Sequence, residues 1–284
     1  MFTVLEALVQ QNQGKISLED DIRDYIAEFR LYDDAKDSLS LRALGSHLSG
    51  LGRDGSPQQF EMTNFIVLAN DIKKFPDPKS INALNDFETS AAAFCDEGTT
   101  DRSNGTKICT KADLLKAISS RHLSFEPWTR PLYSNTGFDL LGWAVAKAAS
   151  QKTKGLISQG PELSPLEKEV TLEALLSQDV FEPLKMKDSS FWVPLDKRDS
   201  VAVPRNGTPC MIDWDFTSTF NPYSHFCRFG LTFSAGGMYT TANDLAKFIN
   251  QVILSPNSSI LSKQHVREWL SPLYVFPDRK TTVG

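Results

Sequence analysis

The sequence lacks the features of membrane-spanning and nucleic-acid-binding proteins. No apolar run approaches the roughly 20 residues that a membrane-spanning helix needs, so we expect no membrane partner. Lys and Arg, 30 in all, are outnumbered by 35 Asp and Glu, and the net charge of -5 argues against a nucleic-acid partner. Residues 1–8 contain no basic segment and no small-residue cleavage site, so this chain shows no signal peptide.

The short motifs of nucleotide-dependent and metal-dependent enzymes are also missing. The sequence has no Gly-x-x-x-x-Gly-Lys phosphate loop, no His-Glu-x-x-His and no Cys-x-x-Cys. We therefore expect no metal and no cofactor. Residues 233–236 nearly form a nucleophile elbow around Ser234, but Thr232 stands where that motif requires its first glycine. Ser234 is thus a poor candidate for a nucleophile.

Cysteine is scarce, but the four residues are arranged in two local pairs. Cys95 and Cys109 bracket one polar loop, and Cys210 and Cys227 bracket another. An even count in this arrangement suits two loop-closing disulfides. Free buried cysteines are the alternative that the sequence leaves open.

Three N-glycosylation sequons lie in loop-like contexts rich in Gly, Ser and Pro. They begin at Asn104, Asn206 and Asn257. Each triplet can arise by chance, but together with the paired cysteines they indicate secreted ancestry. This expectation stands although the chain shows no signal peptide.

The 284 residues, 40% of them hydrophobic, are enough for a substantial core, and apolar periodicity predicts mainly helices. We expect one domain over residues 1–284, in which the polar, Gly- and Pro-interrupted residues 151–168 form a surface insertion. Helices are predicted at residues 2–12, 17–29, 40–51, 111–119, from about 135, at 172–180 and from 241.

The most informative stretch begins at Pro131, which fixes a turn. Asn135 or Thr136 then occupies the position of a helix N-cap. The following apolar residues recur at three- and four-residue steps: Phe138, Leu141, Val145 and Ala149. Tyr133 and Asn135 therefore project from a rigid loop ahead of a buried helix, which suits polar groups that must be held still. A capped helix with a packed tyrosine is the alternative, and we interpret His47 as a structural histidine.

Four sequence blocks follow one another in a recognisable order. They are residues 14–20 (GKISLED), 41–51 (LRALGSHLSGL), 133–137 (YSNTG), and 181–186 (FEPLKM) with 235–246 (AGGMYTTANDLA). Together they resemble the serine β-lactamase-related family, in the branch of class C β-lactamases, D-alanyl peptidases and esterases. The resemblance implies an α+β fold of the β-lactamase/penicillin-binding-protein type. Here it would comprise mainly the helical middle of that fold, with few short strands.

The chemistry that the resemblance implies is acyl transfer through a covalent serine ester. The serine of a Ser-x-x-Lys pair attacks an amide or ester carbonyl, and it needs a base because a hydroxyl is a poor nucleophile at neutral pH. In this branch the tyrosine of a Tyr-x-Asn motif shares the work of the base, and the asparagine helps to hold the substrate. By resemblance Tyr133 takes the first role and Asn135 the second, with a small amide or ester as substrate.

The sequence departs from the family pattern at both ends. No Ser-x-x-Lys occurs in the 284 residues, and the resemblance places that motif just before Met1. Residues 280–282 (KTT) are not the late Lys-Thr-Gly strand motif. We therefore expect a truncated chain without most of the antiparallel sheet. Phe2, Leu5 and Leu8 would then lose their partner, and self-association through this apolar surface is expected.

Three functions remain open. The first is a serine hydrolase of this family in truncated form. The second is an inactive remnant that serves as a binding protein. The third is an acyltransferase of small-metabolite biosynthesis on the same fold.

Overall fold

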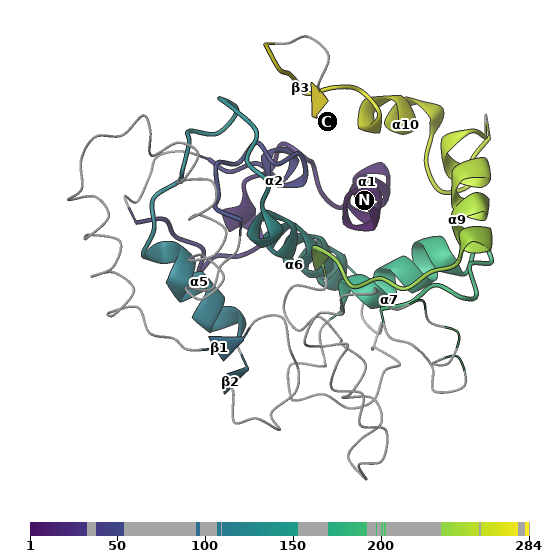
Figure 1. Cartoon of the computed structure of the whole chain (residues 1–284), viewed down its shortest axis with the longest axis horizontal. Helices are drawn as coiled ribbons and strands as arrows, with labels where there is room; N and C mark the ends of the chain where they lie inside the picture. The colour runs from purple at the N-terminus through teal and green to yellow at the C-terminus, as the bar shows by residue number, and fades with distance from the viewer. Residues whose placement is uncertain are drawn as a thin grey trace.

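The structure, a computed structural model, is dominated by helices arranged around the first one. It describes residues 1–32, 38–53, 95–96, 107–108, 110–152, 170–191, 197, 200, 202, 234–255, 257–277 and 282–283. Helix α1 (Phe2–Asn12) lies in the middle of this part of the chain (Figure 1). Around it stand α2 (Leu41–Gly45), α6 (Asn135–Lys152), α7 (Leu172–Leu176), α9 (Ala242–Phe248) and α10 (Lys263–Trp269).

Helix α1 is almost wholly buried, which corrects the expectation of an exposed apolar face. Phe2, Leu5 and Leu8 are 9%, 0% and 1% exposed. The Phe2 ring packs edge-on against Phe181 at 5.9 Å between ring centroids and lies 5.1 Å from the ring of Phe248. Aromatic residues of later helices thus cover the surface that we expected to lack a partner. The helix ends before Gly14, whose φ of 67° lies in the left-handed region that glycine tolerates.

Polar N-caps explain where most of the helices begin. A Ser or Thr hydroxyl accepts a hydrogen bond from the backbone N–H three residues later at the start of α2, α5 (Lys111–Ser119), α7, α9 and α10. The capping residues are Ser40, Thr110, Thr171, Thr241 and Ser262. The predicted helices at 111–119 and from 241 are confirmed, whereas α10 was not predicted.

The predicted helix at residues 17–29 is wrong. Only the short 3-10 helix η1 (Ile22–Asp24) forms there. The reason is that backbone groups needed for a longer helix bond instead to a distant segment. The N–H of Ile22 donates to the carbonyl of Leu39, and that of Leu41 donates to the carbonyl of Asp20. Tertiary pairing therefore replaces the helical ladder.

Two helices change their winding towards their C-terminal ends. Helix α7 continues as the π-helix η4 (Ser177–Phe181), and α9 continues as the π-helix η7 (Ile249–Ile253). The helix predicted at 172–180 is therefore present, with its second half in π geometry. The π turn places Asp179 near α1, where its carboxylate accepts a hydrogen bond from Gln10 at 3.1 Å.

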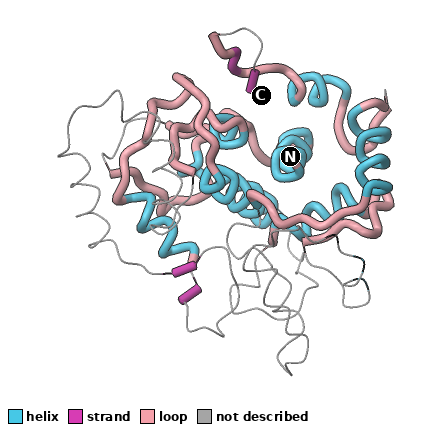
Figure 2. The backbone as a smooth tube through the Cα atoms, in the orientation of Figure 1, coloured by secondary structure: helices cyan, strands magenta, loops and turns pink. Residues whose placement is uncertain are grey.

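Strands are few and short in the described part of the chain, as the expected fold class requires. β1 (Cys95–Asp96) pairs in parallel with β2 (Lys107–Ile108). β3 (Tyr274–Val275) pairs antiparallel with β4 (Thr282–Val283), with Tyr274 opposite Val283 (Figure 2). These two-residue pairs stand at the edges of the helical body.

Asp244 fastens the turn after η4 to the start of α9. Its side chain is fully buried and accepts bonds from the Asp188 N–H (2.8 Å), the Ser189 hydroxyl (2.9 Å) and the Lys247 ammonium (2.6 Å). Burial alone would raise the pKa of this carboxyl. The bonds from Lys247, Asp188 and Ser189 outweigh burial and hold the pKa below its ordinary value. The segment just after block 181–186 is thereby joined to block 235–246.

Several predictions fall wholly or partly outside the described residues. The predicted surface insertion at 151–168 lies outside the described residues except for 151 and 152, which are the last two residues of α6. Cys109, Cys210 and Cys227 are not described, nor is the side chain of Cys95, and the same holds for the sequons at Asn104 and Asn206. Asn257 is exposed.

None of the helices described has both the length and the apolar character needed to cross a membrane. Among the same residues, no cluster of three His, Cys, Asp or Glu side chains is placed to hold a metal ion.

Candidate active site

The Tyr-Ser-Asn-Thr-Gly segment leads directly into α6, and Ser134 caps that helix. The Ser134 hydroxyl accepts a bond from the Gly137 N–H at 2.9 Å and donates to the carbonyl of Gly52 at 2.8 Å. Ser134 is completely buried. The prediction that Asn135 or Thr136 caps the helix is therefore wrong. Ser134 was missed because any of three short polar residues in a row can act as a cap, and only the backbone geometry selects one.

The next anchor of α6 is the backbone of Arg53. Its carbonyl accepts bonds from the N–H groups of Asn135 at 2.7 Å and Thr136 at 3.2 Å. The first N–H groups of a helix have no partner within the helix, so this carbonyl satisfies two of them. Asn135, half-buried, is the first residue of α6. Its position is thus fixed from both the Ser134 cap and the Arg53 carbonyl.

Tyr133 stands at the surface immediately before this cap. The residue is 55% exposed. One face of its ring lies against the imidazole of His47, with 4.6 Å between ring centroids, and the guanidinium of Arg53 lies 5.9 Å from the ring centroid. The ring is thus held on two sides while the residue stays open to a ligand. The catalytic roles of Tyr133 and Asn135 remain predictions.

His47 is the residue that connects this loop to the first half of the chain. Its Nδ1 accepts a bond from the Ser134 N–H at 3.1 Å, and its carbonyl accepts one from the Leu132 N–H at 2.8 Å. Its ring stacks on Phe138 at 4.9 Å as well as on Tyr133. Sequence reasoning missed this contact because 87 residues separate His47 from Ser134, and no local pattern reports such a pairing.

The imidazole of His47 is held in its neutral form. Burial lowers the pKa of His47 to about 4, and the positive charge of the Met1 ammonium acts in the same direction. A neutral imidazole can accept a hydrogen bond at Nδ1, as the Ser134 contact requires. Met1 and His47 line one pocket, so the start of α1 lies near the Tyr133 loop.

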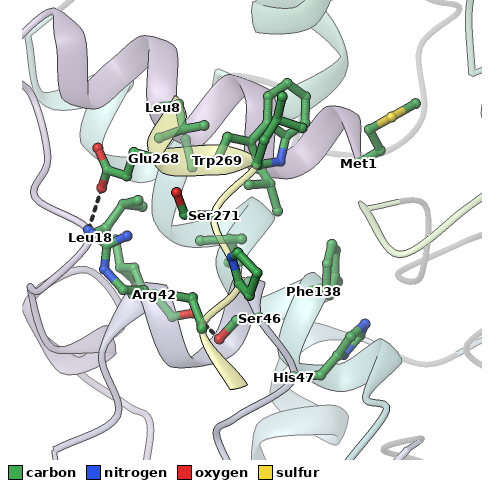
Figure 3. A pocket seen from close by; sticks show the side chains of 18 of the residues that line it. Met1, Leu8, Leu18, Arg42, Ser46, His47, Phe138, Glu268, Trp269 and Ser271 are labelled. Carbon is green, nitrogen blue, oxygen red and sulfur yellow. Dashed lines mark hydrogen bonds and ion pairs between the residues drawn. The ribbon is translucent and has the colours of Figure 1, made fainter. Parts of the chain in front are cut away.

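An apolar pocket of about 550 Å³ adjoins His47. His47 and Phe138 lie at one end of it, and the side chains of α10 lie at the other (Figure 3). Arg42 and Glu268 form an ion pair at 2.6 Å along its wall. Large hydrophobic residues that line the pocket and are themselves exposed are Met1, Ile249, Leu270 and Leu273.

Ser234 does not have the surroundings of a nucleophile. It is 4% exposed, and within the described chain its hydroxyl has no hydrogen-bond partner and hence no base. Its carbonyl accepts a bond from the Thr3 hydroxyl at 2.5 Å. The described site therefore offers an exposed phenol and a neighbouring amide, Tyr133 and Asn135.

The chain is similar in sequence to proteins of one family. The Beta-lactamase family model matches residues 1–281. Beta-lactamase-like protein 4 of Dictyostelium discoideum is 24% identical over 298 residues, which is 100% of this chain and 41% of that protein.

Two solved structures show the same fold. A hydrolase with promiscuous acyltransferase activity, EstCE1, matches with a TM-score of 0.60 and 16% identity over 99% of this chain and 63% of its own. A D-stereospecific amidohydrolase from Streptomyces sp. matches with a TM-score of 0.56 and 17% identity over 100% of this chain and 66% of its own. The expected β-lactamase/penicillin-binding-protein-like fold is confirmed. With the family model matching nearly every residue, the chain belongs to the Beta-lactamase family.

Proposed function

We propose that the chain carries the tyrosine and asparagine side of a serine acyl-enzyme site that takes a small amide or ester. The observation that supports this most is the placement of Tyr133: its ring is held 4.6 Å from His47, yet the residue is 55% exposed. The loop lies near the start of α1, since Met1 and His47 line the same pocket. The family resemblance places the serine and lysine directly before that point.

The proposed roles follow from the chemistry of acyl transfer. The serine oxygen bonds to the substrate carbonyl carbon while the serine proton passes to the base, whose work Tyr133 shares. The bond to the amine or alcohol then breaks, and the leaving group takes that proton. The Asn135 amide contacts the substrate from the first turn of α6. Water would release the acyl group in a second, equivalent transfer.

Two further functions each have an observation in their favour. Transfer of the acyl group to an alcohol is favoured by the similarity to EstCE1, a hydrolase with promiscuous acyltransferase activity. Binding without turnover is favoured by the absence of a Ser-x-x-Lys pair from all 284 residues. Both would use the same Tyr133 and Asn135 surface. Product analysis with and without an alcohol acceptor separates them, because binding without turnover forms no product.

The test is ligand binding and covalent labelling of the 284-residue chain. Calorimetry with penicillin G and with a p-nitrophenyl ester measures binding, and intact-mass spectrometry detects acylation. We expect reversible binding that Asn135→Ala and Tyr133→Phe weaken by roughly tenfold each, about 1.4 kcal/mol. Tyr32→Phe is the matched control, because Tyr32 is 61% exposed and also stacks on a histidine at 4.6 Å.

Two outcomes contradict the proposal. The first is that neither compound binds, or that the Tyr133 and Asn135 variants bind as tightly as Tyr32→Phe does. The second is a covalent adduct on a serine of this chain, because a nucleophile would then lie somewhere other than before Met1. Genomic sequence that encodes an in-frame Ser-x-x-Lys upstream of Met1 would support it directly.

The remaining expectations are part of the same proposal. We propose secreted ancestry with two disulfides, Cys95–Cys109 and Cys210–Cys227, and glycosylation at Asn104, Asn206 and Asn257. Peptide mapping under non-reducing conditions tests both. Because the apolar face of α1 is buried, self-association would have to use the exposed pocket residues instead. Sedimentation of the chain and of Leu270→Glu tests this, with a lighter species expected for the variant.

A further inference from the structure

We infer that His47 is a positioning residue that sets the orientation of Tyr133 through a hydrogen bond from the Ser134 backbone. This inference deepens the proposed function, since it rests on Tyr133 being the proton-transfer group. His47 would touch no substrate. It would act by holding the residues on both sides of the tyrosine.

The tether consists of contacts on either side of Tyr133. Before it, the Leu132 N–H donates to the His47 carbonyl at 2.8 Å; after it, the Ser134 N–H donates to His47 Nδ1 at 3.1 Å. Between these bonds the Tyr133 ring lies on the imidazole at 4.6 Å, with the planes 33° apart. One residue thus contacts three successive residues of the loop.

The backbone of His47 has an energetically unfavourable conformation. Its φ is 60°, in the left-handed region that residues other than glycine rarely adopt. Asn is among the residues that tolerate this region best. The constraint makes Asn a suitable replacement, because its Oδ1 is separated from Cα by the same number of bonds as Nδ1 of histidine.

The tether needs an unprotonated Nδ1. A protonated imidazole would direct its own N–H at the Ser134 N–H, and two donors cannot bond each other. Among the described residues, the charged and titratable groups around the ring are the Met1 ammonium just before α1, the Arg53 guanidinium beyond Tyr133, and Tyr133 itself. Arg42 and Glu268 line the same pocket as an ion pair. The Met1 ammonium, like burial, favours the neutral ring.

Three variants of the full chain separate the hydrogen bond from the ring packing. His47→Asn keeps an acceptor and loses the ring, His47→Phe keeps a ring and loses the acceptor, and His47→Ala loses both. The readouts are the exchange rate of the Ser134 N–H and the resonance of the Tyr133 ring carbon bearing the hydroxyl. We expect roughly tenfold faster exchange in the Phe and Ala variants and near wild-type exchange in the Asn variant.

His122→Asn is the matched control, because His122 stacks on Tyr32 with the same 4.6 Å separation. It should leave both signals unchanged. If His47→Phe keeps both signals and His47→Asn loses them, ring packing alone holds the loop and the inference is overturned. Unchanged signals in His47→Ala would overturn it as well.

A titration of the unmodified protein needs no variant to fold. The Ser134 N–H resonance should move in a single one-proton step near pH 4, and His47→Asn should lack that step. The absence of this step in the wild type, while circular dichroism still shows folded protein, would overturn the inference. These signals report on the loop whether or not a ligand binds. A tethered loop in a chain that binds neither probe would leave the inference standing and contradict the proposed function instead.

Discussion

Glu6 on α1 and Asp179 on η4 share one hydrogen-bond donor. The side-chain nitrogen of Gln10 lies 2.6 Å from Glu6 Oε1 and 3.1 Å from Asp179 Oδ2. Glu6 is completely buried, and in the part of the chain that is described its Oε2 has no hydrogen-bond partner. Burial raises the pKa of Glu6 to about 8, and Asp179 adds to the shift while Gln10 opposes it.

This pair predicts that stability falls as the pH rises from about 4.5 to about 8. The ordinary pKa of the carboxyl is 4.5, so over that interval the folded state keeps a proton that the unfolded state has released. The slope contributed by Glu6 is at most about 1.4 kcal/mol per pH unit. Glu6→Gln keeps the shape without the charge and should remove this slope, as urea unfolding at several pH values can measure.

Glu28, which is exposed, provides the control for that experiment. Glu28→Gln should leave the pH dependence as it is in the wild type. A Glu6→Gln variant that retains the wild-type slope would show that Glu6 is charged in the folded protein, which contradicts the prediction.

Asp244→Ala should strongly destabilise the chain. The substitution leaves the Asp188 N–H and the Ser189 hydroxyl without their acceptor and removes the bond to Lys247. We expect a loss of about 2–4 kcal/mol in the free energy of unfolding. Because the pKa of Asp244 is lowered, its stabilising effect is present at neutral pH and disappears as the pH falls through the folded-state value.

The neighbouring ion pair of Asp188 with Lys197 gives the comparison. Its side chains are 46% and 43% exposed, so Asp188→Asn should cost well below 1 kcal/mol. Chemical denaturation of both variants decides the matter. Equal losses in the free energy of unfolding would contradict the prediction, because the buried bonds of Asp244 would then stabilise the chain no more than an exposed ion pair does.

Gly142→Ala should weaken the packing of α6 against the segment around Ser234. A Cβ at this position would lie 2.2 Å from Ser234 Oγ and 2.6 Å from Ser234 Cβ. Ser234 is buried, and its Cβ is attached directly to the backbone, so it cannot easily move away. We therefore expect the free energy of unfolding to fall by about 1–3 kcal/mol, as thermal unfolding can measure. Gly236→Ala is the control, since nothing lies within 4 Å of its Cβ. A Gly142→Ala variant as stable as Gly236→Ala would refute the placement of Ser234.

Ser134→Ala should cost more than an ordinary helix cap. It removes the acceptor of the Gly137 N–H and the donor to the Gly52 carbonyl, both at a buried residue. Loss of a cap costs about 1 kcal/mol, and the unmet carbonyl adds about as much again. Thr110→Ala removes an exposed cap for comparison. Unfolding measurements that give Ser134→Ala the smaller loss would contradict this account.

The parts of the fold that the sequence predicted are those governed by local rules. Helix α1 followed from its apolar periodicity, the helix at 111–119 was predicted from the sequence, and the start of α9 at Thr241 followed from capping chemistry. The sequence did not show which residues pack against α1. Phe181 and Phe248 lie far along the chain, so periodicity showed that Phe2 needs a cover without showing what provides it.

The candidate site divides in the same way. Family resemblance selected Tyr133 and Asn135, and the structure places Tyr133 at the surface and Asn135 at the first turn of α6. The anchors of this loop were not predictable. His47 and Arg53 act largely through backbone carbonyls and one ring nitrogen, and sequence letters carry no signal for such contacts.

The cap at Ser134 bears on how a Tyr-x-Asn motif can change over evolutionary time. The motif is written with a variable middle letter, but here that letter is the buried residue of the three, and its hydroxyl bonds both the Gly137 N–H and the Gly52 carbonyl. On the proposed function, selection for folding would fall on Ser134 and selection for chemistry on its two neighbours. In a lineage without catalysis, we therefore expect substitution of the buried Ser134 to cost more folding stability than substitution of the exposed Tyr133.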